Sequence, residues 1–271
     1  MTEAIKDYDA YQHRMNKSLI DKLFFADKIP DDINIIVDYG CADGTLLKAI
    51  RPMFPNAFLM GFDIDEKMIQ KAQEDGNKED VFYFSDWKML LAAMGRIKSE
   101  LFSDGKKFKT AIIASSLIHE VYSYGTPEQV AKFWDQMFIS DFDYICIRDM
   151  MVSMPVDRPS DINDVVRVLR KFHRTKPLLD FQANWGNIEN NKNLVHFLLK
   201  YRYLEPNWDR EVKENYIPLY REDFLALIPE KYMVTFHEHY TLPYLMEIVL
   251  NDMGVVLKDP THIKVILSKN K

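Results

Sequence analysis

The chain has 271 residues, of which 47% are hydrophobic and 13% aromatic, and this suits one large α/β domain or one domain with an elaboration. The net charge of −6 and a pI near 5.7 argue against a broadly basic surface for nonspecific nucleic-acid binding, although a local basic groove is compatible with them. There is no run of about 18 apolar residues and no apolar signal core at the start, so we expect a cytoplasmic protein without a membrane span.

Hydrophobic periodicity predicts the elements in chain order. A helix is expected over about residues 6–28, because its apolar side chains are mostly three or four residues apart. Five apolar stretches predict strands near residues 33–39, 57–63, 81–85, 109–115 and 142–148. Helices are expected between them near residues 44–52, 65–75, 87–98 and 127–139. This alternation predicts a parallel sheet, in which Cys41 and Cys146 would be buried and reduced.

The alternation stops after the fifth strand. Residues 151–214 contain one expected helix, near residues 161–175, followed by an aromatic and polar stretch. From residue 215 the regular pattern returns. Its expected elements are a helical segment at residues 221–228, a strand at 232–240, a helix at 243–253 and a last strand at 262–267. We therefore expect one domain over residues 1–271 with an insertion at residues 151–214.

A glycine-containing turn follows the first strand. The strand ends near Asp38, the turn contains Gly40, and Gly44 precedes the next helix. Glycine lets a ligand approach the backbone closely because it has no Cβ atom, and the start of the helix offers free N–H groups. Such a turn is typical of sites for nucleoside-containing cofactors. An ordinary strand-to-helix turn is the alternative, and the glycine spacings of nicotinamide sites and P-loops are absent.

Two further strands also end in an acidic residue. Asp63 lies 19 residues after Gly44, a spacing at which a carboxylate can accept hydrogen bonds from ribose hydroxyls. Asp86 follows the third strand and precedes Trp87. Each acid could instead cap the following helix, since aspartate is favoured at that position. All of the acids together, at these spacings, favour a ligand site.

The stretch from Asp38 to Gly44 resembles motif I of the class I S-adenosylmethionine (SAM)-dependent methyltransferases, with Ala42 in place of the middle glycine. The resemblance implies an α/β fold with a seven-stranded, mostly parallel Rossmann-like sheet, helices on both faces and an antiparallel last strand. It implies SAM as the cofactor, with Asp63 at the ribose and Asp86 at the adenine amino group. The cofactor-binding residues that it implies are Asp38, Gly40, Cys41, Ala42, Gly44, Asp63, Ile64, Asp86, Trp87 and Ser115.

The resemblance covers residues 30–150 and 215–271, which would form the SAM-binding core of a single methyltransferase domain. Residues 1–29 would form an N-terminal helical segment. The insertion at residues 151–214 would form a helical cap after the fifth strand and recognise the methyl acceptor. The alternatives are a SAM-binding regulatory or assembly subunit without methyl transfer, and a different nucleotide-binding α/β enzyme.

His119 and Glu120 are the candidate catalytic residues. They follow the fourth strand, whose carboxyl end borders the ligand crevice in a sheet of this kind, and histidine titrates near neutral pH. His119 would act as a base if the acceptor has a proton to lose. Glu120 would orient His119 or itself be the polar group in the site. The alternative is a structural role for both residues at the turn.

A metal ion is not expected from the sequence. The imidazoles of His237 and His239 would point to one face of a strand, and with Glu238, His119 and Glu120 they suggest a metal site. Two strand histidines are, however, more often ordinary hydrogen-bonded residues than metal ligands.

A basic stripe in the insertion is the candidate acceptor site. Arg167, Arg170 and Arg174 are spaced by three and four residues and would share one face of a helix. Trp185 belongs to the aromatic stretch that follows. Together they favour an anionic acceptor, either a phosphate-bearing small molecule or an RNA. The alternative is a solvated basic face above an aromatic core.

Overall fold

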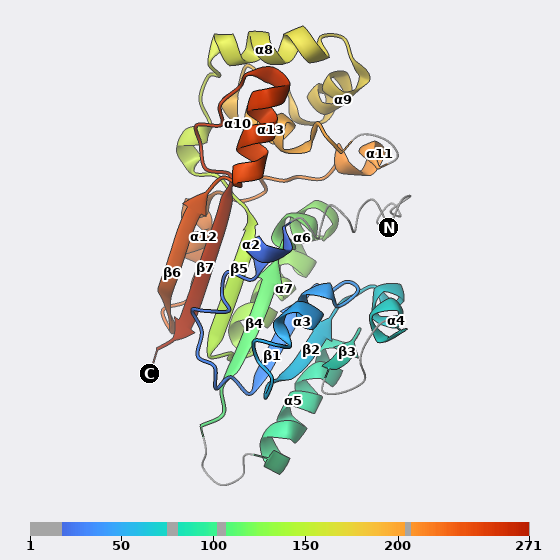
Figure 1. Cartoon of the computed structure of the whole chain (residues 1–271), viewed down its shortest axis with the longest axis vertical. Coiled ribbons are helices and arrows are strands. Elements are labelled where there is room, and N and C mark those ends of the chain that lie inside the picture. The colour runs from blue at the N-terminus through green and yellow to red at the C-terminus, as the bar shows by residue number, and fades with distance from the viewer. Residues whose placement is uncertain (1–17, 75–80, 102–106, 204–206, 271) are drawn as a thin grey trace.

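The computed structural model describes residues 18–74, 81–101, 107–203 and 207–270. Its centre is a seven-stranded sheet with the order β3-β2-β1-β4-β5-β7-β6 (Figure 1). The strands are β1 (Ile35–Tyr39), β2 (Phe58–Phe62), β3 (Val81–Phe84), β4 (Thr110–Ser115), β5 (Tyr144–Met150), β6 (Tyr232–Tyr240) and β7 (His262–Lys269). Each strand overlaps a predicted one, so the prediction of seven strands is confirmed.

The sheet is mixed. Strands β1 to β5 pair in parallel, whereas β7 runs antiparallel to both of its neighbours, β5 and β6. In the register, Val37 of β1 pairs with Met60 of β2 and with Ile112 of β4, so these three strands end at the same edge of the sheet. The chain order reverses between β1 and β4, and open α/β sheets bind ligands at such a point.

Helices cover both faces of the sheet, as predicted. Ile35 and Val37 of β1 belong to one buried cluster and Ile36 belongs to another, because successive side chains of a strand point to opposite faces. The helices packed in these clusters are α3 (Thr45–Ile50), α4 (Glu66–Glu74), α5 (Trp87–Leu101), α7 (Pro127–Ile139) and α12 (Arg221–Leu227). Among the described residues, no helix combines the length and the apolar character that crossing a membrane requires.

A short helix, α6 (Ile118–Tyr124), follows β4 and was not predicted. The N–H groups of Leu117 and Ile118 at its start both donate to Oδ2 of Asp149, at 2.8 and 2.6 Å. Asp149 lies in β5, so a side chain some 30 residues further along the chain satisfies N–H groups that a helix start leaves free. The local sequence does not reveal a cap of this kind.

Residues 151–217 and α13 (Pro243–Met253) form what we call the helical region, at one end of the sheet (Figure 1). Its other elements are the 3₁₀ turn η1 (Met154–Val156) and the helices α8 (Ile162–Phe172), α9 (Lys176–Trp185), α10 (Asn191–Lys200) and α11 (Trp208–Glu211). Phe197, Trp208 and Val249 are buried together in its core. The aromatic stretch of the sequence therefore contributes to a packed interior, and only α8 and α13 of these helices were predicted.

The predicted N-terminal helix lies partly outside the described residues, because residues 6–17 are not among them. Within them, the chain forms the short helix α2 (Leu19–Lys22). Its Asp21 carboxylate accepts hydrogen bonds from Arg148 at 2.8 Å and Tyr240 at 2.5 Å, and it pairs with Lys264 at 2.6 Å. These contacts fix α2 to the strands β5, β6 and β7.

Candidate functional site

The turn after β1 has the unusual backbone that the sequence suggested. Gly40 and Gly44 have φ angles of 81° and 74°, and Ala42 between them has a φ of 45°. This left-handed conformation is unfavourable for residues other than glycine. A Cβ atom on Gly40 would also lie only 2.8 Å from the side chain of Leu117, so glycine is required there for space as well.

Asp63, which follows β2, holds this turn in place. One oxygen of its carboxylate accepts the N–H of Ala42 at 2.9 Å, and the other accepts the N–H of Asp65 at 2.9 Å. Burial raises the pKa of Asp63, while the two backbone hydrogen bonds lower it. Each carboxylate oxygen has two lone pairs, so Asp63 can accept further hydrogen bonds from a ligand.

A cavity of about 1020 Å³ opens at this edge of the sheet. The predicted cofactor residues that line it are Asp38, Gly40, Cys41, Ala42, Asp63, Ile64, Asp86, Trp87 and Ser115. Gly44 is the one member of the predicted set that does not line the cavity. Residues at the ends of four strands are thus brought together around one space.

Asp38 and Lys22 both line the cavity as buried, oppositely charged side chains. Burial raises the pKa of Asp38 to about 7, against the attraction of Lys22. Burial lowers the pKa of Lys22 to about 8, and repulsion from Arg148 adds to this, against the attraction of Asp38. Each group would be stabilised by an opposite charge on a ligand. Lys22 was not predicted, because helical periodicity does not show which side chain meets a cavity formed elsewhere.

Asp86 and Trp87 both have a structural contact as well as a place on the cavity. The Asp86 carboxylate accepts the N–H of Lys88 at 2.7 Å, so it does cap the following helix, as the alternative interpretation held. The Trp87 ring packs 5.2 Å from the rings of Tyr39 and Phe62, measured between centroids. Little of this ring is therefore exposed to a ligand.

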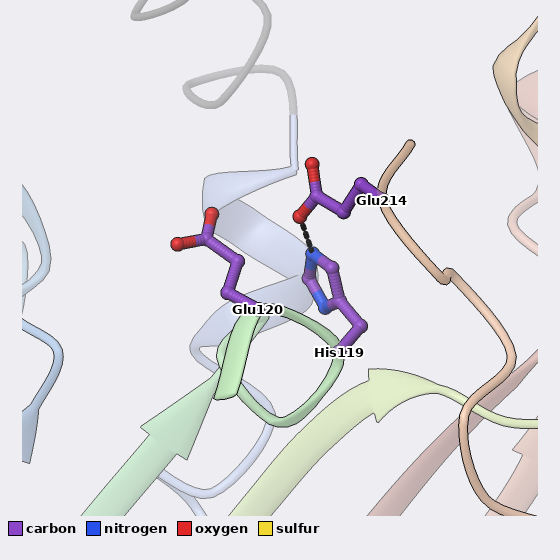
Figure 2. A group of neighbouring side chains, drawn as sticks. All are labelled: His119, Glu120 and Glu214. Carbon is purple, nitrogen blue, oxygen red and sulfur yellow. Dashed lines mark ion pairs between the residues drawn. The ribbon is translucent and has the colours of Figure 1, made fainter. Parts of the chain in front are cut away.

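His119 lies behind the cavity wall and does not line it. Its Nδ1 is 2.6 Å from Oδ1 of Asp149, and its Nε2 is 3.4 Å from Oε1 of Glu214 (Figure 2). Burial alone would lower the pKa of His119, but the charge and hydrogen bond of Asp149, and then the charges of Glu214 and Glu120, raise it to about 9. Both ring nitrogens are thus occupied by carboxylates.

Glu120 is the member of this group that lines the cavity. Glu214 comes from the helical region and is 2% exposed, and burial raises its pKa to about 7 against the attraction of His119. Arg210, also from the helical region, lies 3.6 Å from Glu120 and 3.6 Å from Glu214. The helical region therefore contributes two charged side chains to this edge of the cavity. The sequence interpretation missed them because no local pattern reveals contacts between such distant segments.

The predicted acceptor residues lie elsewhere. Arg167, Arg170 and Arg174 are exposed, on α8 or just after it, at the outer side of the helical region (Figure 1). The indole N–H of Trp185 donates to the carbonyl of Val212 at 2.6 Å. None of these four predicted residues lines the cavity, so the structure does not bring the basic stripe to the cofactor site.

The histidine pair on β6 does not join the His119 group. Among the described residues, the group of histidine and acidic side chains with the geometry for a metal ion consists of His119, Glu120 and Glu214. His239 instead has its Nε2 3.1 Å from the carbonyl oxygen of Met151. This is the ordinary hydrogen-bonded role that the sequence favoured for such histidines.

A protein family described as a methyltransferase domain matches residues 31–175, which is more than half of the chain. The chain belongs to this methyltransferase family. It is an enzyme of the SAM-dependent type, and SAM is its methyl donor, so the family and cofactor inferred from the residues Asp38 to Gly44 are confirmed. No curated protein matches the chain.

Solved structures support the fold of this methyltransferase. A SAM-dependent methyltransferase from Anabaena variabilis is 14% identical with a TM-score of 0.50, covering 100% of this chain and 98% of that one. One from Mesorhizobium loti is 14% identical with a TM-score of 0.48, covering 93% and 96%. The plantazolicin methyltransferase BpumL, in complex with a triazolic desmethylPZN analog and SAH, is 15% identical with a TM-score of 0.46, covering 97% and 88%.

Proposed function

We propose that this methyltransferase binds SAM in the cavity at the carboxyl ends of β1 to β4 and transfers its methyl group to a small polar acceptor beside Glu120. The observation that carries the proposal is the common position of the cofactor residues, which come from four strand ends and line one cavity. Pockets for a single drug-sized ligand measure roughly 300–1,000 Å³. The cavity of about 1020 Å³ therefore has room for SAM and a small acceptor.

The charges of the cavity fit the amino-acid end of SAM. Asp38 would bind the α-ammonium group, and Lys22 would bind the α-carboxylate. Both side chains are buried, and their pKa values are shifted toward the neutral forms. A zwitterionic ligand would supply the charge that each of them lacks.

The polar groups of the cavity also fit the nucleoside end. Asp63 would accept hydrogen bonds from the ribose hydroxyls, and Asp86 would accept one from the adenine amino group. Asp63 is already oriented by two backbone N–H groups, which reduces the entropy lost on binding. The hydroxyl of Ser115 is buried and, among the described residues, has no hydrogen-bond partner. A ligand in the cavity would satisfy it.

The residues of the protein mainly have to orient the reactants and exclude water. When bound, SAM supplies a methyl group activated by a positively charged sulfur. We propose that the Glu120 carboxylate orients the acceptor and takes up a proton if the nucleophile carries one. His119 was predicted for this part, but its ring does not line the cavity and both of its nitrogens face carboxylates. It would act as a positioning residue behind Glu120.

We further propose the domain organisation expected from the sequence, with residues 1–271 as one methyltransferase domain and residues 151–214 as a cap. Arg210 and Glu214 support the cap, since they connect the helical region to Glu120 and His119. Because a cluster rich in carboxylates borders the acceptor end of the cavity, a small molecule fits better than an RNA. The cytoplasmic location remains a prediction.

Methyl transfer from labelled SAM tests this function. The protein is incubated with labelled SAM and a cell extract, which is then separated into small molecules, nucleic acid and protein. We expect the label among the small molecules, and transfer to the acceptor should fall by about 10²-fold or more in Glu120→Gln with SAM affinity preserved. Glu128→Gln, an exposed change on α7, is the control. Binding of SAM without transfer to any fraction would instead indicate a regulatory or assembly subunit.

A further inference from the structure

Three potential ligand atoms face a common point beside the cavity. These are Nε2 of His119 and one carboxylate oxygen each from Glu120 and Glu214, and all three atoms lie within 4.8 Å of one another (Figure 2). His119 and Glu120 come from α6, whereas Glu214 reaches them from the helical region. The group is therefore assembled only in the folded chain.

The orientation of the His119 ring suits a metal ligand. Asp149 Oδ1 lies 2.6 Å from Nδ1 and is buried with it. When Nδ1 carries the proton of this hydrogen bond, Nε2 presents its lone pair to Glu214. Histidines that bind metals nearly always donate their other N–H to a carboxylate, a carbonyl or water, because this fixes the tautomer and the direction of the ring.

Glu214 supplies an independent observation that points to a ligand. Its side chain is 2% exposed, and its Oε1 has no hydrogen-bond partner among the described residues. The distance of 3.4 Å from this oxygen to Nε2 of His119 is longer than an N–H···O hydrogen bond. Two ligands of a tetrahedral ion, each about 2.0–2.1 Å from it, lie about 3.4 Å apart. An ion between them would satisfy both atoms.

The surrounding charges also favour a cation. Arg210 is the guanidinium shared by Glu120, Glu211 and Glu214, at 3.6, 3.3 and 3.6 Å. It reaches the other oxygen of Glu214, Oε2. The buried ammonium of Lys200 donates to the main-chain carbonyls of Glu211 and Glu214, which fixes the segment that carries Glu214. Negative charges remain in excess around Arg210, and buried carboxylates are costly unless a cation compensates them.

We propose that His119, Glu120 and Glu214 bind a divalent transition-metal ion, such as Zn²⁺ or Mn²⁺, with Asp149 as the carboxylate that orients the imidazole. The ion would take the place of a proton on Nε2. One imidazole and two carboxylates match the ligand preferences of these ions. Glu120 lines the cavity, so the ion would enter from there, and an open coordination position would face the acceptor. This goes beyond the proposed function, since SAM binding and methyl transfer do not require the ion.

Metal binding to the full-length protein tests the site directly. The protein is dialysed against a chelator and titrated with Zn²⁺ by calorimetry and with Mn²⁺ by electron paramagnetic resonance. We expect about one ion per chain, and affinity lowered at least about tenfold in Glu214→Gln and in Glu120→Gln. Glu120 is partly exposed, with 32% of its side chain accessible, so its variant should fold even if a change at the buried Glu214 does not.

Matched controls separate this site from surface binding. Glu211→Gln alters a carboxylate that pairs with Arg210 but is not a proposed ligand, and His237→Gln removes an imidazole on β6. Both variants should bind the ion like the wild type. The proposal is overturned if the wild type binds neither Zn²⁺ nor Mn²⁺, or if folded Glu120→Gln and Glu214→Gln bind them as tightly as the controls do. Either result would leave the cluster as an ion-pair network only.

Discussion

The wall of the large cavity and the helical region compensate their buried charges in different ways. At the cavity, Asp38 and Lys22 attract each other, but within the described residues their side chains form no hydrogen bond, and burial shifts the pKa of each. In the helical region, Lys200 is fully buried, yet its ammonium donates to two main-chain carbonyls. Arg158 likewise makes two hydrogen bonds with Asp259, at 3.0 and 2.8 Å.

This difference shows where a ligand is needed. A charged group that is buried without a partner is costly, and a ligand of opposite charge recovers part of that free energy on binding. The charges of the helical region are already satisfied, so they stabilise the fold and fix the segment that carries Arg210 and Glu214. We therefore expect substitutions in the helical region to change mainly stability, and substitutions at the cavity to change mainly SAM binding.

The largest effect is expected in the core of the helical region. Trp208 is 1% exposed, so Trp208→Ala should lower the free energy of unfolding by about 3–5 kcal/mol, because it leaves a large cavity. Urea unfolding measures this, with Leu179→Ala, which is 53% exposed on α9, as the control. A loss below about 1 kcal/mol would contradict the packed core and would return Trp208 to the role of a surface residue that stacks on ligands.

The pH dependence of SAM binding should report the two buried charges of the cavity. Asp38 must be ionised to bind an ammonium group, so affinity should rise as the pH increases through about 7. Lys22 must be protonated to bind a carboxylate, so affinity should fall as the pH increases through about 8. Between pH 7.5 and pH 6, the Kd should increase about tenfold.

Variants separate the two limbs of this profile. Asp38→Asn should bind SAM more weakly and lose the acid limb, and Lys22→Met should weaken binding by about tenfold. Calorimetry at a series of pH values measures both. A flat profile between pH 5.5 and 9 with the folded wild type would show that these side chains do not bind the charged end of SAM.

The smallest effect is expected at the basic stripe. Arg170 and Arg174 are exposed and remote from the lining of the cavity. The double variant Arg170→Glu and Arg174→Glu should leave the acceptor KM and the SAM Kd within about twofold of wild type, because exposed charges at such a distance are screened. Steady-state kinetics measure both constants. A KM raised by tenfold or more would restore the anionic-acceptor hypothesis.

The sequence was informative where function is local. The residues from Asp38 to Gly44 form one short turn, and Asp63 and Asp86 follow strands that alternation alone reveals. The antiparallel β7 and the family also followed from the sequence. Contacts between distant segments were not predictable in this way. Glu214 reaches His119 only because the helical region folds back onto α6.

The same limit explains the basic stripe. Three arginines at helical spacing do share an exposed helix, but periodicity does not determine whether that face is turned to the cofactor or to solvent. The aromatic residues that follow were open to two interpretations for a similar reason. Trp208 is buried in the structure, and the indole N–H of Trp185 is bound to a main-chain carbonyl.

The central claim is that SAM binds in the cavity with Asp63 at its ribose, and calorimetric titration of Asp63→Ala with SAM tests it most directly. The removed carboxylate accepts charge-assisted hydrogen bonds worth about 1.5–3 kcal/mol, so we predict a Kd at least about tenfold higher than that of the wild type. Asp65→Asn is the matched control, because Asp65 caps α4 through Lys67 and does not line the cavity. Unchanged SAM affinity in a folded Asp63→Ala protein would contradict the claim.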